Sequence, residues 1–197
     1  MGSPKALLRF GGETLIERVT RRLVEPSTEV IVVAGPHVAL PALPAHVRAV
    51  QDDRPLQGPL AGILYGLRAA TTEICFVCGC DHPFLAPAVA RLLVEHARQD
   101  GAVSVWEGRE QPLVAAYRRG VAEIAANLLA SGEHRALALL EWARLTRVAG
   151  SDLAAADPSG QSFFDVDTPE AYARALRLLS SEGEPGPAGG VRARQSS

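Results

Sequence analysis

Two short, uninterrupted apolar runs constrain the fold of this chain more strongly than any other feature. Residues 30–34 read Val-Ile-Val-Val-Ala and end at a Gly-Pro pair, and residues 74–78 read Ile-Cys-Phe-Val-Cys. Continuous runs of this kind are typical of strands that are buried on both faces, as in a parallel sheet. They are far too short to span a bilayer. We therefore expect two buried strands, the second extending over 73–79.

Helical periodicity alternates with these runs. In residues 13–24, Leu15, Ile16, Val19 and Leu23 fall near one helical face, and the charged residues, Arg18 among them, fall mostly elsewhere. The same kind of pattern predicts helices over 58–70, 86–98, 120–130 and 134–143, a last helix with Thr168 as N-cap, and strands over 46–50, 102–106, 113–117 and 163–165.

This alternation, with short connections, predicts a three-layer α/β domain of the Rossmann-like type with a mostly parallel sheet. The 197 residues are 47% hydrophobic, which is enough for one large domain over residues 1–179. Residues 180–197 are dominated by Gly, Pro, Ser and Glu, so we expect a disordered tail there.

Charge and targeting signals exclude several classes of protein. The formal net charge is −2, without the clustered basic surface of a nucleic-acid binder. The beginning of the sequence lacks the long apolar core of a secretion signal. We therefore expect a cytoplasmic protein whose partners include neither nucleic acid nor membrane.

Three cysteines lie close together, and with His82 they offer four soft ligands. An odd number of cysteines without a distant partner argues against a disulfide framework. On a strand, Cys78, Cys80 and His82 share one face and Cys75 points to the other, which disfavours one tetrahedral metal site. We favour small apolar side chains on a buried strand.

The first residues place Lys5 between Gly2 and the pair Gly11-Gly12, directly before a helix-forming run. In an α/β nucleotide site such a stretch normally follows a strand and its phosphate loop, where glycine amides and a lysine meet phosphate. No strand precedes it here. We expect either that the start is too late or that part of a phosphate-binding loop is lost.

Several polar residues follow the expected strands, where ligands gather in an open parallel sheet. They are Asp52 and Asp53, the turn Gly58-Pro59-Leu60, Asp81, and Asp165 with Asp167. Together with Lys5 they suit a reaction of a nucleotide with Mg²⁺, which binds one or two carboxylates plus substrate phosphates. A lone aspartate after a strand is more often a turn former or helix cap, so the order and spacing of the whole set carry the hypothesis.

These residues resemble a known family. Met1-Gly2-x2-Lys5, Gly58-Pro59-Leu60-Ala61-Gly62, Cys80-Asp81-x-Pro83, Gln111-Pro112-Leu113 and Asp165-Val166-Asp167-Thr168-Pro169-Glu170 occur in the order seen in molybdenum cofactor guanylyltransferases. The resemblance covers nearly all of the chain before the tail. It implies the fold of nucleotide-diphospho-sugar transferases and the transfer of GMP from GTP to molybdopterin-bound molybdenum, with Mg²⁺ and release of pyrophosphate.

The resemblance also implies roles for individual residues. Lys5 matches the lysine that contacts the nucleotide, Asp81 the metal-binding aspartate, and Asp52 or Asp53 a nucleotide-contacting aspartate. Asp167 stands where the family often has asparagine on the pterin side, and Asp165 lies beside it. Partners implied are GTP, the molybdopterin cofactor, and cofactor-insertion proteins or molybdoenzymes.

The start of the chain departs from the family pattern, which has a strand and Leu-Ala-Gly-Gly-x3-Arg before the Met-Gly. Loss of a central strand would expose two strand edges and apolar helix faces. We expect a misassigned start or a truncated sequence. Two other functions stay open: a cytidylyltransferase for the same cofactor, and a nonenzymatic protein that binds nucleotide or pterin.

Overall fold

The computed structural model describes residues 5–36, 38–51 and 58–181. The chain divides into two compact units, Met1–Asp165 and Val166–Ser197. None of the helices in the described ranges has the length and apolar character needed to cross a membrane.

All strands of the described residues lie in the first unit. These are β1 (Arg9–Phe10), β2 (Glu13–Thr14), β3 (Val30–Ala34), β4 (Val47–Gln51), β5 (Ile74–Cys78), β6 (Gly101–Trp106), β7 (Arg109–Arg118) and β8 (Leu145–Ala149). Its α-helices are α1 (Leu15–Val24), α2 (Gly58–Ala69), α3 (Pro87–His96), α4 (Val121–Ala130), α5 (Leu139–Trp142) and α6 (Ser151–Ala156). Its 3-10 turns are η1 (Lys5–Leu7), η2 (Ala136–Ala138) and η3 (Gln161–Phe163), and the second unit holds α7 (Pro169–Ser181).

The strands form a mixed arrangement. β3 and β4 pair in parallel, and a separate four-stranded sheet has the order β5-β7-β6-β8. Within it β6 and β8 are parallel, whereas β7 runs antiparallel to both of its neighbours. The reason is local: a turn of only two residues, Glu107 and Gly108, both at positive φ, joins β6 to β7, and so short a connection links only antiparallel strands.

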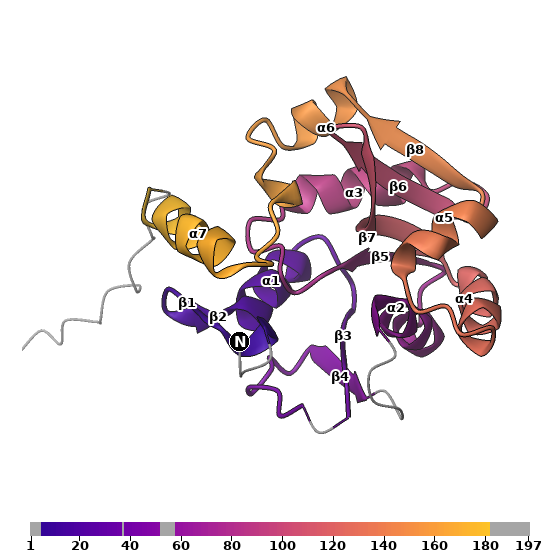
Figure 1. The fold of residues 1–197 in the computed structure, drawn as a ribbon, viewed down its shortest axis with the longest axis horizontal. Helices are drawn as coiled ribbons and strands as arrows, with labels where there is room; N and C mark the ends of the chain where they lie inside the picture. Colours follow the sequence, from indigo (N-terminus) through magenta and orange to yellow (C-terminus); the bar gives the residue numbers. More distant parts are fainter. Residues whose placement is uncertain (1–4, 37, 52–57, 182–197) are drawn as a thin grey trace, which may run out of the picture. The chain divides into compact units, whose positions relative to one another are not determined.

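Helices cover both faces of the four-stranded sheet, as the three-layer prediction requires (Figure 1). On one face Ala115 and Tyr117 of β7 pack into a cluster with α2, α4 and α5. On the other face Val114 and Ala116 pack with α3 and Leu153 of α6. Alternate residues of one strand therefore serve two cores, as the pleat dictates.

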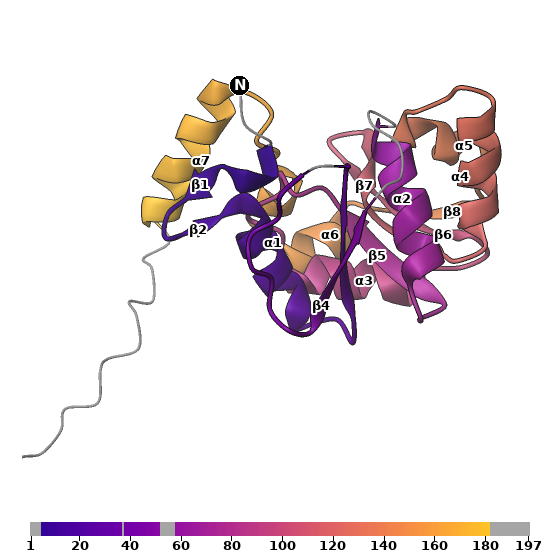
Figure 2. The ribbon, with the colours of Figure 1, turned by 90° about the horizontal axis from the view of Figure 1, so that it is seen from below.

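β3 and β5 form where the apolar runs predict them, but they are less buried than expected. In β3 only alternate residues are fully buried, and every residue of β5 is half-buried. The two strands are not paired with each other, and the β3–β4 pair stands between α1 and α2 (Figure 2). Among the described residues each of these strands pairs along one edge only. Both strands lie at the edge of a sheet, and their side chains are less buried than those of a central strand.

The cap positions agree with the sequence, and several short elements do not. Thr168 accepts a hydrogen bond from the Ala171 amide at 3.1 Å, which confirms it as the cap of α7. α1 begins at Leu15 rather than at 13, because Thr14 and Glu17 form a capping box.

The strand predicted over 163–165 is wrong, since η3 occupies its start. The helix predicted over 134–143 is instead η2 followed by the short α5. The sequence analysis missed the strands β1, β2 and β8, the helix α6 and the 3-10 turn η1.

Candidate functional site

Lys5 and Asp81 approach each other although 76 positions separate them in the sequence. Lys5 Nζ lies 3.9 Å from Asp81 Oδ2, with both side chains partly exposed. Lys5 begins η1, and Asp81 lies in the turn that follows β5. The two groups that the sequence analysis expected to converge at this end of a strand are thus neighbours in the first unit.

A glycine sets the place of the Asp81 carboxylate. The Gly79 amide donates to the Leu113 carbonyl at 3.2 Å, which continues the β5–β7 pairing by one residue. A Cβ on Gly79 would lie 2.2 Å from Asp81 Oδ1. Only glycine leaves room for the carboxylate to fold back over the end of the strand.

Two arginines of α1 hold the segment after Asp81. Arg18 Nε donates to the Pro83 carbonyl at 2.8 Å, and Arg22 Nε donates to the Leu85 carbonyl at 2.7 Å. Arg18 is only 6% exposed, so the expectation that it lies off the buried face is wrong. The i, i+4 spacing of the two arginines was the available signal, since it puts both guanidinium groups on one side of the helix.

Aromatic packing ties the same segment to distant parts of the first unit. The Phe84 ring packs edge-on against Phe10, with centroids 5.7 Å apart, and against Phe164 at 6.1 Å. The Arg18 guanidinium lies 5.2 Å from the centroid of Phe10 and 5.5 Å from that of Phe84. The β1–β2 hairpin, whose turn is Gly11-Gly12, is thereby fixed beside the Asp81 segment.

The turn that opens α2 is anchored to another loop. Gly58 has φ +68°, and a Cβ there would lie 2.8 Å from the His134 carbonyl oxygen. The Leu60 amide donates to this oxygen at 3.3 Å, and the Leu60 side chain is fully buried in the core. Gly58 and Pro59 are exposed, so only they present surface to a ligand; Leu60 instead fixes the turn.

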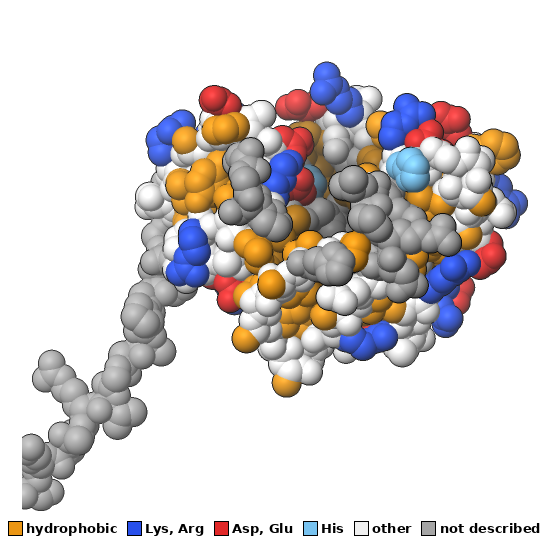
Figure 3. All heavy atoms as spheres, turned by 60° about the horizontal axis from the view of Figure 1, so that its bottom comes forward, with side chains coloured by type: hydrophobic (Ala, Val, Ile, Leu, Met, Phe, Trp, Pro, Cys, Tyr) orange, Lys and Arg blue, Asp and Glu red, His pale blue; other side chains and the backbone are white. Residues whose placement is uncertain are grey.

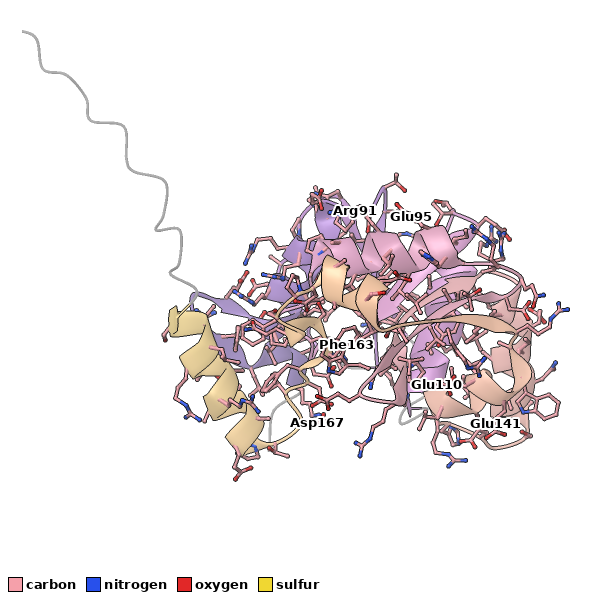
Figure 4. All side chains as sticks on the ribbon, turned by 90° about the horizontal axis from the view of Figure 1, so that it is seen from above. Arg91, Glu95, Glu110, Glu141, Phe163 and Asp167 are labelled. Carbon is pink, nitrogen blue, oxygen red and sulfur yellow. The ribbon has the colours of Figure 1, made fainter. Side chains whose placement is uncertain are left out.

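Two of the remaining predicted site residues are exposed, and two lie outside the described residues. Asp165 is exposed at the end of the first unit, and Asp167 is exposed in the second unit (Figure 4). Asp52 and Asp53 lie outside the described residues.

The cysteines behave as small strand residues. Cys75 packs against the core on the α2 side of the sheet and Cys78 against the core on the α3 side, so they face opposite ways, as predicted. Burial, with a smaller contribution from the Asp81 carboxylate, raises the pKa of Cys80 to about 11. Burial also raises the pKa values of Cys75 and Cys78. The raised pKa values favour the protonated thiols at neutral pH.

The chemistry available at the Lys5–Asp81 pair is that of one ammonium and one hard oxygen donor. Within the described ranges, no three His, Cys, Asp or Glu side chains are placed to hold a metal ion together. A partly exposed carboxylate that leaves most coordination positions to water and phosphate suits Mg²⁺, whereas a structural zinc site needs a closed set of protein ligands. The pair therefore fits a cation that a polyphosphate brings with it.

Known proteins resemble this chain over most of its length. Residues 1–148 match the family model of the MobA-like NTP transferase domain. A probable molybdenum cofactor guanylyltransferase of Bacillus cereus (strain AH187) is 31% identical over 92% of each chain. Another so named, from Pelotomaculum thermopropionicum, is 33% identical over 94% of this chain and 90% of its own.

Solved structures show the same fold. Molybdopterin-guanine dinucleotide biosynthesis protein A from Archaeoglobus fulgidus superposes with a TM-score of 0.76 at 24% identity, over 91% of this chain and 92% of its own. The 2-C-methyl-D-erythritol 4-phosphate cytidylyltransferase from Thermus thermophilus gives 0.67 at 21% identity, over 90% and 94%. With a family match over most of its length and relatives above 30% identity, this chain belongs to the MobA-like NTP transferase family.

Proposed function

We propose that this protein transfers GMP from GTP to the molybdenum-molybdopterin cofactor, releasing pyrophosphate and forming the guanine dinucleotide cofactor. The names of the relatives that match at least nine-tenths of both chains support guanylyl transfer. The structural observation that supports it is the 3.9 Å approach of Lys5 and Asp81 at the end of β5. A polyphosphate and its counter-cation need a positive and a negative group side by side.

In the proposed reaction, a terminal phosphate oxygen of the pterin cofactor attacks the α-phosphorus of GTP. The new P–O bond forms as the bond from the α-phosphorus to the oxygen bridging to the β-phosphate breaks, and pyrophosphate departs with both bonding electrons. The Lys5 ammonium stabilises the charge that grows on the leaving phosphates. Catalysis rests on positioning and electrostatics, without a protein nucleophile.

Asp81 would hold Mg²⁺, which when bound neutralises phosphate charge. The Arg18 and Arg22 hydrogen bonds to the segment after Asp81 keep this carboxylate in place. We further propose that Asp52 or Asp53 orients the nucleoside and that the exposed Gly58 and Pro59 line the nucleotide side. Asp165 and Asp167 would then lie on the side of the pterin substrate.

The first prediction tests the role of Asp81. Replacing Asp81 with asparagine removes the charge that would hold the cation, so we expect pyrophosphate release from GTP to fall at least about 100-fold. The rate is measured with purified protein, GTP, Mg²⁺ and molybdenum-molybdopterin. Asp152→Asn is the matched control because Asp152 is an exposed aspartate of α6, outside the proposed site. Full activity of Asp81→Asn would refute the assignment.

The same assay separates the rival functions. Faster turnover of CTP than of GTP would identify a cytidylyltransferase for this cofactor. Nucleotide binding without pyrophosphate release from either nucleotide would identify a nonenzymatic binding protein.

A further inference from the structure

A buried histidine directly follows Asp81 and has no role in the reaction proposed above. His82 is 6% exposed. Its Nδ1 atom is buried, and within the described ranges no hydrogen-bond partner reaches this atom. Buried polar atoms are hydrogen-bonded in the large majority of cases, so an unpaired one needs a physical explanation. The other ring nitrogen of His82 supplies it.

The surroundings of the ring decide which nitrogen carries the proton. A neutral imidazole has one N–H donor and one acceptor. If the proton were on Nδ1, the lone pair of Nε2 would face a carboxylate oxygen, Asp81 Oδ1, which lies 3.9 Å away. A proton on Nδ1, in the neutral or the cationic ring, would also bury an N–H donor that has no acceptor. A proton on Nε2 alone avoids both arrangements.

The turn after β5 fixes this ring beside the carboxylate. Successive side chains of an extended strand point to opposite sides, so Asp81 and His82 approach each other because the chain turns here. A Cβ on Gly79 would overlap Asp81 Oδ1 and lie 3.3 Å from His82 Cδ2, so the two side chains share the space that glycine leaves. The Leu85 amide donates to the His82 carbonyl at 3.2 Å and holds the backbone of the turn.

The two oxygens of the Asp81 carboxylate have different neighbours. Oδ1 faces the His82 ring, whose side chain is 7% exposed, and Oδ2 lies 3.9 Å from Lys5 Nζ, whose side chain is 39% exposed. Basic and acidic side chains also lie against each other on the surface of the protein, near the top of the face in view in Figure 3. The terminal torsion of an aspartate is broad, so a neighbouring group must decide which oxygen faces the solvent.

We propose that His82 is a positioning residue, whose Nε2–H group holds Oδ1 of Asp81 and leaves Oδ2, on the Lys5 side, to the cation. The separation of 3.9 Å exceeds a hydrogen bond, so the interaction is that of an N–H dipole with a charge. Burial of the ring strengthens it, because electrostatic interactions are weakly screened in a protein interior. The role toward the cation rests on the proposed function, whereas the position of the proton rests on the geometry alone.

The position of the proton is tested on the whole chain without nucleotide or metal. Nitrogen-15 NMR distinguishes protonated from unprotonated ring nitrogens, and the signals that disappear in His82→Gln are those of His82. At about pH 8, above the ordinary titration range of histidine, we expect a protonated Nε2 and an unprotonated Nδ1. A proton on Nδ1, on both nitrogens or shared equally between them would overturn the proposal, whatever reaction the protein catalyses.

A matched pair of variants tests the effect on the cation. His82→Gln keeps an N–H donor near the position of Nε2, whereas His82→Met keeps only an apolar side chain of similar length. The probe is Mn²⁺ in the presence of GTP, and its binding is followed by electron paramagnetic resonance. We expect the Kd of Mn²⁺ to rise at least about tenfold in His82→Met and less than about threefold in His82→Gln. His46→Met, at an exposed histidine before β4, should leave the Kd unchanged.

The pattern of losses separates positioning from packing. Equal losses of affinity in both His82 variants would mean that the ring acts by packing, and unchanged affinity in His82→Met would mean that it does not act on the cation; either result overturns the proposal. Asp81→Asn is measured beside them. If Asp81→Asn weakens Mn²⁺ binding and His82→Met does not, only the role of His82 fails, and if neither does, the role of Asp81 fails too. Should His82→Met not fold, the NMR result on the unaltered chain decides alone.

Discussion

At the scale of single residues, Arg18 links the stability of the protein to its candidate site. It is buried, it donates to a backbone carbonyl of the segment after Asp81, and its guanidinium lies over two phenylalanine rings. A buried charge is tolerated only where hydrogen bonds and an opposite charge compensate its lost hydration. Glu13 supplies the opposite charge, 3.5 Å away.

Arg18→Met should lower the free energy of unfolding by about 2–4 kcal/mol, because it removes a charged hydrogen bond and a cation–π contact while keeping an apolar side chain. Urea denaturation measures the effect. Arg21→Met is the matched control: Arg21 also pairs with Glu13 but its side chain is 61% exposed, so we expect a loss below about 1 kcal/mol. Equal losses in the two variants would contradict the role given to Arg18.

The sequence predicted the chemistry of individual site residues better than their surroundings. Asp81 was singled out because ligands gather where parallel strands end, and Lys5 because it stands between glycines before a helix-forming run. The structure brings their side chains together. Arg18 was misassigned because helical periodicity sorts side chains by polarity, and a buried arginine violates that sorting. Leu60 was included as part of a turn that follows an expected strand, but its side chain is fully buried in the core.

At the scale of elements, one loop shows how short segments hold α3 in place. The Asp157 carboxylate accepts hydrogen bonds from the amides of Ser159 and Ser162 and from the Ser159 hydroxyl. Ser162 Oγ in turn accepts from the Ala86 amide at the start of α3, at 2.8 Å. Burial alone would raise the pKa of Asp157, but the hydrogen bonds from Ser159 and Ser162 outweigh it and lower the pKa below its usual range.

Asp157→Asn should reduce the free energy of unfolding by about 1–3 kcal/mol at pH 7, because a charged acceptor of several hydrogen bonds is lost. A lowered pKa stabilises the folded state above the unfolded pKa of about 3.9, and this contribution disappears as the pH falls through the folded pKa. The difference between the variant and the unaltered protein should therefore shrink below about pH 4. Urea denaturation at about pH 7, 5 and 3.5 measures it, and a difference that is constant with pH would contradict this account.

The turn before η3 depends on a glycine for two separable reasons. Gly160 has φ +66°, and a Cβ there would lie 2.3 Å from Trp106, whose ring stacks on Phe163. Gly160→Ala should cost about 2–4 kcal/mol, from backbone strain plus overpacking. Gly132→Ala isolates the strain, because Gly132 has φ +87° but nothing within 4 Å of its Cβ. Chemical denaturation measures the free energy of unfolding of both variants. If Gly160→Ala loses no more stability than Gly132→Ala, overpacking against Trp106 does not contribute.

Elements with a strong local pattern were predictable, and elements made by tertiary contacts were not. The runs of β3 and β5 and the caps of α1 and α7 have local signals in the sequence. β8 alternates weakly and exists because it pairs with β6. The residues expected as a strand at 163–165 instead begin with the last residue of η3, the turn that Asp157 and Gly160 impose. Such segments obtain their conformation from partners that a single sequence does not display.

At the scale of the whole molecule, the separation of the two sheets predicts uneven stability within the first unit. β6 and β7 lie at the centre of the four-stranded sheet, where residues 102–104 and 114–117 are fully buried. β3 and β4 form a two-stranded sheet, β4 is half-buried to exposed along its length, and β3 borders a cavity of 560 Å³. A two-stranded sheet alone is marginally stable, so this part should open without the rest.

Native-state hydrogen exchange tests this expectation. Amides of β6 and β7 should exchange only through global unfolding, and their opening free energy should fall steeply with denaturant. Amides of β3 and β4 should exchange at least about tenfold faster, through an opening that depends weakly on denaturant because it exposes less surface. The comparison has an internal control in β8, which is also a sheet edge but pairs with the buried β6. If β3 and β4 were protected as strongly as β6, the first unit would unfold as one cooperative body, and the open edges of β3 and β5 would not be the weak point of this fold.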